Sequence, residues 1–211
     1  MQKKKAAEKF AVVGILRGIG IEDVDPIVDA SIAGGLPAIE VTMNTPGFEQ
    51  ILKRMKVVAA GRITVGAGTV LGEESLHKAL AAGAEFIVSP VFEEHIVEYC
   101  AENQIPVFPG ALTPTEIYAA WSAGATMVKL FPAKFFGTEY IKEVLAPLDK
   151  VRILACGGVS ATNVSDYFSA GAMAVAFGGS IFSKSRIENG EFEKITKDIS
   201  ILVKGASAYM A

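Results

Sequence analysis

The stretch Ala123-Gly124-Ala125-Thr126-Met127-Val128-Lys129-Leu130-Phe131-Pro132 joins two elements of different kinds. It begins at the end of an amphipathic segment, Pro114–Ala123, and continues into a short apolar run, Met127–Phe131, of the kind that forms a strand buried on both faces. A glycine just past a helix can adopt the left-handed conformation that ends the helix. The stretch therefore predicts a helix, a tight joint and a parallel strand.

The same joint occurs at three other places in the chain. It is found as Ala33-Gly34-Gly35 before Ala38-Ile39-Glu40, as Ala82-Gly83-Ala84 before Phe86-Ile87-Val88, and as Ala170-Gly171-Ala172 before Ala174-Val175-Ala176. The alternation runs along the chain as eight strand–helix units without a linker. Eight units predict an α/β fold, a (β/α)8 TIM barrel, as one domain over residues 1–211. A doubly wound open sheet is the alternative, and the count of eight favours the barrel.

The expected boundaries follow from the apolar runs and the segments between them. The strands are Ala11–Leu16, Pro37–Thr42, Ile63–Gly66, Phe86–Val88, Pro106–Phe108, Met127–Phe131, Arg152–Ala155 and Ala174–Phe177. The helices are Asp23–Gly34, Gly47–Ala60, Glu73–Ala82, Glu93–Glu102, Pro114–Ala123, Thr138–Leu145, Ala161–Ala170 and Phe192–Lys204, with an extra N-terminal helix at Lys3–Phe10.

The composition limits the function classes. The chain has 211 residues, 51% of them hydrophobic, and a net charge of −3, so we expect neither nucleic acid nor a membrane surface as partner. No apolar run approaches the ~20 residues of a membrane span, and Lys3-Lys4-Lys5 lacks the apolar core of a signal peptide. Cys100 and Cys156 form neither a disulfide framework nor a metal site. We expect a cytoplasmic protein.

Lys129 is unusual inside an apolar run, because a buried ammonium costs several kcal/mol unless it is paired or loses its proton. A lysine has a pKa near ~10.4 in water, and burial can lower that pKa by up to roughly 3–5 units. The neutral amine can attack a ketone and form an imine. The alternative is a lysine at the end of the barrel whose head reaches water.

Glu40 and Thr42 close the second expected strand, and their side chains share a face because they are two residues apart. If Val41 points outward to the helices, both point into the barrel mouth, and we expect Thr42 to contact the substrate. In a barrel, functional groups gather at the C-terminal ends of the strands. A carboxylate beside Lys129 could move protons between the imine and a substrate hydroxyl as a general acid–base group. The alternative role of Glu40 is an ion pair that solvates Lys129.

Two other strand ends carry groups suited to an organic acid. Arg17 follows the first strand and can hold a carboxylate through two hydrogen bonds, although it could instead be a surface arginine bonded to loop carbonyls. Gly66-Ala67-Gly68-Thr69 begins like a dinucleotide-binding motif but has Leu71 in place of the third glycine. We interpret it as a tight turn that presents backbone N–H groups and the Thr69 hydroxyl to a ligand.

Glycine pairs follow the last two strands, in Cys156-Gly157-Gly158 and Gly178-Gly179-Ser180. Barrels often bind phosphate between these two loops and a helix N-terminus, and glycines let backbone amides approach the anion. The pattern predicts a phosphate site. Pro90 and Phe131, at the ends of two other strands, are expected to line the pocket with apolar surface.

The chain closely resembles the class I 2-keto-3-deoxy-6-phosphogluconate (KDPG) aldolase / 4-hydroxy-2-oxoglutarate (KHG) aldolase family from about Phe10 to Ser183. The resemblance rests on motifs in this order: Glu40-Val41-Thr42, Gly66-Ala67-Gly68-Thr69, Ser89-Pro90, Pro109-Gly110, Lys129-Leu130-Phe131-Pro132-Ala133, Gly157-Gly158-Val159 and Gly178-Gly179-Ser180. It implies a (β/α)8 barrel, assembled as a homotrimer, that uses no metal or other cofactor. It also implies cleavage of KDPG to pyruvate and glyceraldehyde 3-phosphate, and of KHG to pyruvate and glyoxylate.

The resemblance also implies roles for single residues. Lys129 would form the Schiff base and Glu40 would be the general acid–base group. Arg17 and Thr69 would contact the pyruvate portion of the substrate. The substrate phosphate would be held by Gly157, Gly158, Gly179 and Ser180.

Two departures from the family pattern concern the substrate. Many members have an arginine in place of Asn44 that holds the substrate carboxylate, and here that role falls to Arg17. Many gluconate-type members have a threonine in place of Cys156, and galactonate-type relatives also lack that hydroxyl. The alternative substrate is therefore the C4 epimer, 2-keto-3-deoxy-6-phosphogalactonate (KDPGal).

Two other functions stay open at this point. A phosphosugar isomerase or epimerase on the same barrel would use Lys129 as a charge partner rather than a nucleophile. A non-catalytic barrel that binds a phosphorylated ligand would need no chemistry from Lys129 or Glu40.

Overall fold

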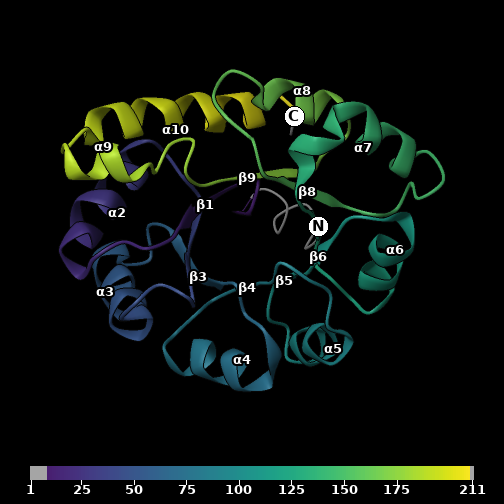
Figure 1. The fold of residues 1–211 in the computed structure, drawn as a ribbon, viewed down its shortest axis with the longest axis horizontal. Coiled ribbons are helices and arrows are strands. Elements are labelled where there is room, and N and C mark those ends of the chain that lie inside the picture. Colours follow the sequence, from purple (N-terminus) through teal and green to yellow (C-terminus); the bar gives the residue numbers. More distant parts are fainter. Residues whose placement is uncertain (1–8, 210–211) are drawn as a thin grey trace.

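In the computed structural model, which describes residues 9–209, nine strands form one parallel sheet that curves into a nearly closed barrel (Figure 1). The strands are β1 (Val12–Leu16), β2 (Ala38–Thr42), β3 (Thr64–Gly68), β4 (Ile87–Val88), β5 (Val107–Phe108), β6 (Gly110–Ala111), β7 (Val128–Leu130), β8 (Ile153–Cys156) and β9 (Ala174–Phe177). Their order around the barrel is β5-β4-β3-β2-β1-β9-β8-β7-β6. The predicted (β/α)8 barrel is confirmed, and the alternative of a doubly wound open sheet is not observed.

The fifth predicted strand, Pro106–Phe108, is observed as β5, and a further short strand that was not predicted, β6, follows directly after Pro109. Val107 and Phe108 pair with β4, whereas Gly110 and Ala111 pair with β7. Proline has no N–H, so it cannot donate to the ladder at this point. The two outermost strands of the sheet, β5 and β6, are therefore consecutive pieces of chain, which brings the sheet round into a barrel.

Helices surround the strands on the outside of the barrel (Figure 1). They are η1 (Ile21–Asp23), α2 (Val24–Ala33), α3 (Phe48–Ala59), α4 (Gly72–Ala81), α5 (Glu94–Glu102), α6 (Pro114–Ser122), η2 (Ala133–Phe135), α7 (Gly137–Leu145), α8 (Val164–Ser169), α9 (Lys184–Glu188) and α10 (Phe192–Ser207). The predicted helices after the first strand are confirmed, and α9 was not predicted. The predicted N-terminal helix Lys3–Phe10 falls almost wholly outside the described residues. No helix in residues 9–209 is both long and apolar enough to cross a membrane.

The repeated joints behave as the sequence predicts. Gly35, Gly83, Gly124 and Gly171 follow α2, α4, α6 and α8, and their φ angles are +79°, +99°, +102° and +100°. These are left-handed conformations that glycine adopts without steric cost. Each helix can therefore end abruptly and turn directly into the next strand.

Aromatic rings fill the barrel near the end at which the strands begin. The ring of Phe10 packs edge-on against Phe86 and Phe108, with centroid distances of 5.2 and 5.1 Å. All three side chains are buried, and a Cβ on Gly66 would lie 2.5 Å from the Phe86 ring. Edge-to-face pairs of this kind stabilise a core by about 0.5–1.5 kcal/mol each beyond area burial. This packing closes one end of the barrel and leaves the polar groups toward the other.

Candidate active site

A pocket of about 480 Å³ lies at the C-terminal ends of the strands. This is the size range of small-molecule sites. Its lining includes the predicted site residues Arg17, Glu40, Thr69, Pro90, Lys129, Phe131, Gly157, Gly158, Gly179 and Ser180. Residues from distant strands therefore converge on one pocket, as expected for the C-terminal face of a barrel.

Lys129 lies in the middle of β7 and is only 6% exposed. Its Nζ atom is 4.9 Å from the centroid of the Phe131 ring, and both residues line the pocket. The alternative of a lysine whose head reaches bulk water does not fit this burial. The amine also lies on the same side of the barrel as the glycine loops, because Gly157 and Gly179 line the same pocket.

Glu40 is 1% exposed, and its Oε2 atom has no hydrogen-bond partner among the described residues. Burial raises the pKa of Glu40 from 4.5 to about 7, although the positive charges of Lys129 and Arg17 act in the opposite direction. No ion pair joins Glu40 to Lys129 in the described part of the chain. A carboxylate with a pKa near neutrality can both accept and return a proton.

One of the two glycines in the second half of β3, Gly68, makes room for Glu40. Gly66 and Gly68 pair with Glu40 and Thr42 across the β2–β3 ladder. A Cβ on Gly68 would lie 2.4 Å from Glu40 Oε1. The prediction of a turn over residues 66–69 is therefore wrong for Ala67 and Gly68, because they continue the strand beyond its predicted end at Gly66.

The turn begins at Thr69, which lines the pocket with a φ of +57°. A β-branched residue rarely adopts this left-handed conformation, and such strain costs about 1–3 kcal/mol. Strain of this kind is concentrated at functional sites, where the surrounding structure maintains it. The structure thus presents Thr69, rather than the preceding glycines, to a ligand.

Arg17 lines the pocket from the loop after β1 and is exposed. Among the described residues it forms no ion pair, and its side chain makes no hydrogen bond. The alternative of an arginine bonded to loop carbonyls is therefore not observed. An unpaired guanidinium at a pocket wall is suited to bind an organic anion.

Thr42 is the predicted site residue that does not line the pocket. It is buried, and its Oγ1 atom lies 3.1 Å from Thr45 Oγ1. Thr45 Oγ1 in turn accepts a hydrogen bond from the Gly18 N–H at 3.0 Å. The expectation that Thr42 lines the pocket is thus wrong, since its hydroxyl is turned toward Thr45 in the loop that directly follows β2.

The two glycine loops lie side by side in the pocket wall. Gly157 and Gly158 have φ angles of +100° and +85°, and Ser180 Oγ donates to the Val159 carbonyl at 2.7 Å. The expected helix N-terminus is not adjacent to Gly179. Instead, the N–H groups of residues 181 and 182 bond to the Gly178 carbonyl in a turn, and α9 begins only at Lys184.

Cys156 lines the pocket at the end of β8, next to the glycine loop. Both cysteines are buried and free, as predicted. Burial raises the pKa of the Cys156 thiol, which therefore stays protonated. No group of three or more His, Cys, Asp or Glu residues in the described part of the chain could hold a metal ion.

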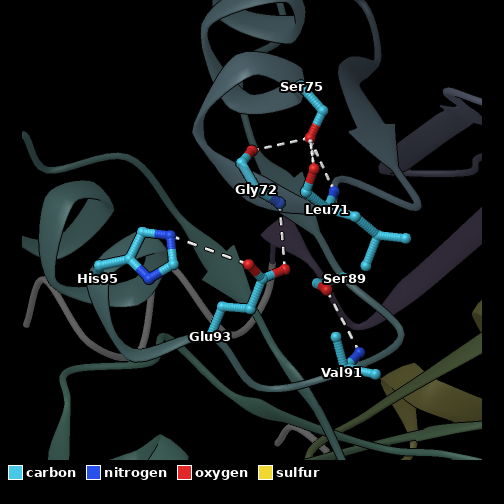
Figure 2. A network of polar contacts seen from close by, with 7 residues as sticks. All are labelled: Leu71, Gly72, Ser75, Ser89, Val91, Glu93 and His95. Carbon is cyan, nitrogen blue, oxygen red and sulfur yellow. Dashed lines mark hydrogen bonds and ion pairs between the residues drawn. The ribbon is translucent and has the colours of Figure 1, made fainter.

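Figure 2 shows a polar network that joins the loops after β3 and β4. The Gly72 N–H, at the start of α4, donates to Glu93 Oε1 at 3.1 Å, and Glu93 Oε2 is 3.8 Å from His95 Nε2. The Val91 N–H donates to Ser89 Oγ at 3.2 Å. The positive end of the helix dipole stabilises a carboxylate at a helix N-terminus. The network fixes the loops that carry Thr69 and Pro90, and no sequence motif indicated it.

A family model, KDPG and KHG aldolase, matches residues 4–198. The chain belongs to the KDPG and KHG aldolase family. It is therefore an aldolase, a carbon–carbon lyase, and the predicted resemblance is confirmed. This membership favours the aldolase over the isomerase and over the non-catalytic barrel.

Relatives of this aldolase include enzymes for both epimers. The chain is 32% identical over 193 residues to a 2-dehydro-3-deoxy-phosphogluconate aldolase of Treponema pallidum, covering 91% of each chain. It is 36% identical over 173 residues to a probable 2-dehydro-3-deoxy-6-phosphogalactonate aldolase of Rhizobium meliloti, covering 81% of each. A KDPG aldolase of Legionella pneumophila, with pyruvate captured at low pH as a covalent carbinolamine intermediate, superposes with a TM-score of 0.86 at 25% identity, covering 96% of this chain and 98% of that one.

Proposed function

We propose that this aldolase cleaves KDPG to pyruvate and glyceraldehyde 3-phosphate through a Schiff base on Lys129. The observation that carries the proposal is the convergence of Lys129, Glu40 and two glycine loops on one pocket. Lys129 is the lysine that lines this pocket. Lys129 is 6% exposed and Glu40 is 1% exposed. The carbinolamine that pyruvate forms in the Legionella pneumophila relative supports the same chemistry.

The proposed reaction begins when the neutral amine of Lys129 adds to the C2 ketone. Glu40 protonates the hydroxyl of the resulting carbinolamine, and water leaves to give a protonated imine, which accepts electrons from the neighbouring bond. Glu40, acting through a water molecule, takes the proton of the C4 hydroxyl as the C3–C4 bond breaks. Glyceraldehyde 3-phosphate leaves, the enamine is protonated at C3, and hydrolysis of the imine releases pyruvate and the free amine.

The remaining pocket residues orient the substrate in this proposal. The unpaired guanidinium of Arg17 binds the carboxylate, and Thr69 contacts the pyruvate portion. The backbone of Gly157, Gly158, Gly179 and Ser180 binds the phosphate. Binding energy from groups remote from the reacting carbons is what aligns C3 and C4 for cleavage.

The phosphate site and Cys156 indicate which substrates the enzyme accepts. KHG offers the 2-keto acid without a phosphate, so we expect it to be cleaved less efficiently. Cys156 lacks the hydroxyl of gluconate-type members, and this favours KDPGal as a second candidate substrate. A pyruvate-release assay with KDPG, KDPGal and KHG would rank the three.

Borohydride reduction in the presence of pyruvate tests the Schiff base directly. We expect mass spectrometry to find a reduced pyruvate adduct on the peptide that contains Lys129. Lys129→Ala should abolish both the adduct and cleavage. Lys134, an exposed lysine beside Gly158, provides the matched control, and Lys134→Ala should still be labelled. An adduct-free protein under conditions that label a relative would end the proposal.

A further inference from the structure

Thr45 joins two loops of the barrel mouth without lining the pocket. It lies after β2, is 2% exposed, and its Oγ1 accepts the Gly18 N–H at 3.0 Å across 27 residues of sequence. The same oxygen lies 3.1 Å from Thr42 Oγ1. Both hydroxyls are buried, so this contact is shielded from competing water.

The N–H that Thr45 holds belongs to the peptide group between Arg17 and Gly18. Fixing that peptide plane restricts the backbone on the C-terminal side of Arg17. Gly18 itself has a φ of +67°, and a Cβ there would meet no atom within 4 Å, so packing does not restrain this position. The Arg17 side chain has no hydrogen-bond partner among the described residues, so the restraint that reaches it comes from the backbone, which sets the direction in which the side chain leaves the loop.

We infer that Thr45 is a positioning residue that aims Arg17 at the substrate carboxylate, with Thr42 orienting the Thr45 hydroxyl. The inference rests on the proposed function, because it takes Arg17 as the carboxylate-binding group. It also gives a role to Thr42, which does not line the pocket but holds the Thr45 hydroxyl in place. Since Thr45 touches neither the amine nor the acid–base group, it acts on substrate binding rather than on bond cleavage.

Thr45→Val keeps the shape of the side chain and removes the hydroxyl. We expect KM for the 2-keto acid substrate to rise roughly 10-fold, with kcat changed by about twofold or less, because the lost interaction serves ground state and transition state alike. Thr45→Ser retains the hydroxyl and should restore KM. A Thr45→Ser variant that behaves like Thr45→Val would overturn the inference.

Thr126→Val is the matched control. Thr126 Oγ1 also accepts a backbone N–H at 3.0 Å, from Val107, but near the ends at which the strands begin. It should leave KM unchanged, which separates a positioning effect from a general loss of stability. If Thr45→Val does not fold, Thr45→Ala provides the same comparison.

Arg17→Ala and the double variant decide whether Thr45 acts through Arg17. In the Arg17→Ala background, Thr45→Val should raise KM no further, whereas independent effects would multiply. Multiplying effects would overturn the inference and leave the proposed function intact. If pyruvate and borohydride fail to label Lys129 in the unmodified protein, the proposed function fails, and the role of Thr45 fails with it.

Discussion

The burial of Glu40 makes the stability of the protein depend on pH. Its pKa is raised from 4.5 to about 7, so between these values the folded protein holds a proton that the unfolded chain has released. The free energy of unfolding therefore falls as the pH rises through this window. The shift corresponds to roughly 3 kcal/mol of lost stability above pH 7.

Glu40→Gln removes this titration. We expect the free energy of unfolding of the variant, relative to the unmodified protein, to rise by roughly 3 kcal/mol between pH 4.5 and pH 8. Urea unfolding at several pH values measures it. Glu74→Gln is the control, because Lys78 lowers the pKa of that exposed carboxyl below the window. Equal behaviour of the two variants would contradict the raised pKa of Glu40.

The same Glu40→Gln variant should cleave substrate roughly 10²–10⁴-fold more slowly if Glu40 is the general acid–base group. Imine formation with pyruvate should be affected less than cleavage, because the nucleophile is still present. Single-turnover kinetics with borohydride trapping separates the two steps. Full-rate cleavage by the variant would assign proton transfer to another group.

Cys156 tests the choice between epimers. Cys156→Thr introduces the hydroxyl of gluconate-type members, and we expect the ratio of kcat/KM for KDPG over KDPGal to rise by roughly 10-fold. Cys156→Val is the control of similar shape without a hydroxyl and should leave the ratio near its original value. The same shift in both variants would show that shape, not hydrogen bonding, decides the preference.

Single residues were predictable where strand periodicity fixes their direction. Lys129 and Glu40 stand out because burying a charged group within an apolar run is costly, so such a group usually has a functional or an ion-pairing role. Thr45 and Glu93 could not be found in this way. Their hydrogen bonds cross between loops, and the path of a loop depends on tertiary contacts that no local pattern encodes. Thr42 was misjudged for a different reason: strand periodicity gives the face of a side chain but not the partner of its hydroxyl, here Thr45 three residues later.

At the scale of elements, β3 is shaped by the carboxylate beside it. Gly68→Ala would put a Cβ 2.4 Å from Glu40 Oε1, so the carboxylate must move. Gly68 has an ordinary strand conformation, so we expect the variant to fold and kcat to fall by roughly 10-fold or more, through misplacement of the acid–base group. Steady-state kinetics with a thermal unfolding control measures this.

A double-mutant cycle sharpens that prediction. Glu40→Asp shortens the side chain and should tolerate the extra methyl group, so the kcat losses of the two changes should not multiply. Multiplying losses would mean that Gly68 serves the strand itself rather than the carboxylate.

Element boundaries were predictable except where a single residue interrupts the pattern. Four helices, α2, α4, α6 and α8, end at the predicted glycines because a left-handed residue is needed there. The separate strand β6 after Pro109 was not predicted, because it depends on which neighbouring strand each piece of chain pairs with. Helix α9 was missed because its five residues carry no amphipathic period, and only the Ser183 cap marks its start.

At the scale of the whole molecule, the family resemblance predicts a homotrimer. Exposed aromatic surface is a common mark of protein interfaces, and Phe135 and Phe136 are 72% and 52% exposed. We expect sedimentation to give a trimer and Phe135→Glu to weaken it. Val57, which is 67% exposed on α3, provides the control as Val57→Glu. A monomeric unmodified protein would contradict the prediction.

The aromatic packing of Phe10, Phe86 and Phe108 has a consequence for the order of events. Because those rings block one end of the barrel, molecules enter and depart through the same opening. Lys129 lies deep in the pocket, whereas Gly158 and Gly179 are exposed nearer its rim. In the proposed reaction the phosphorylated aldehyde thus stands between the enamine and solvent. It must depart before pyruvate, and the reverse condensation must load pyruvate first.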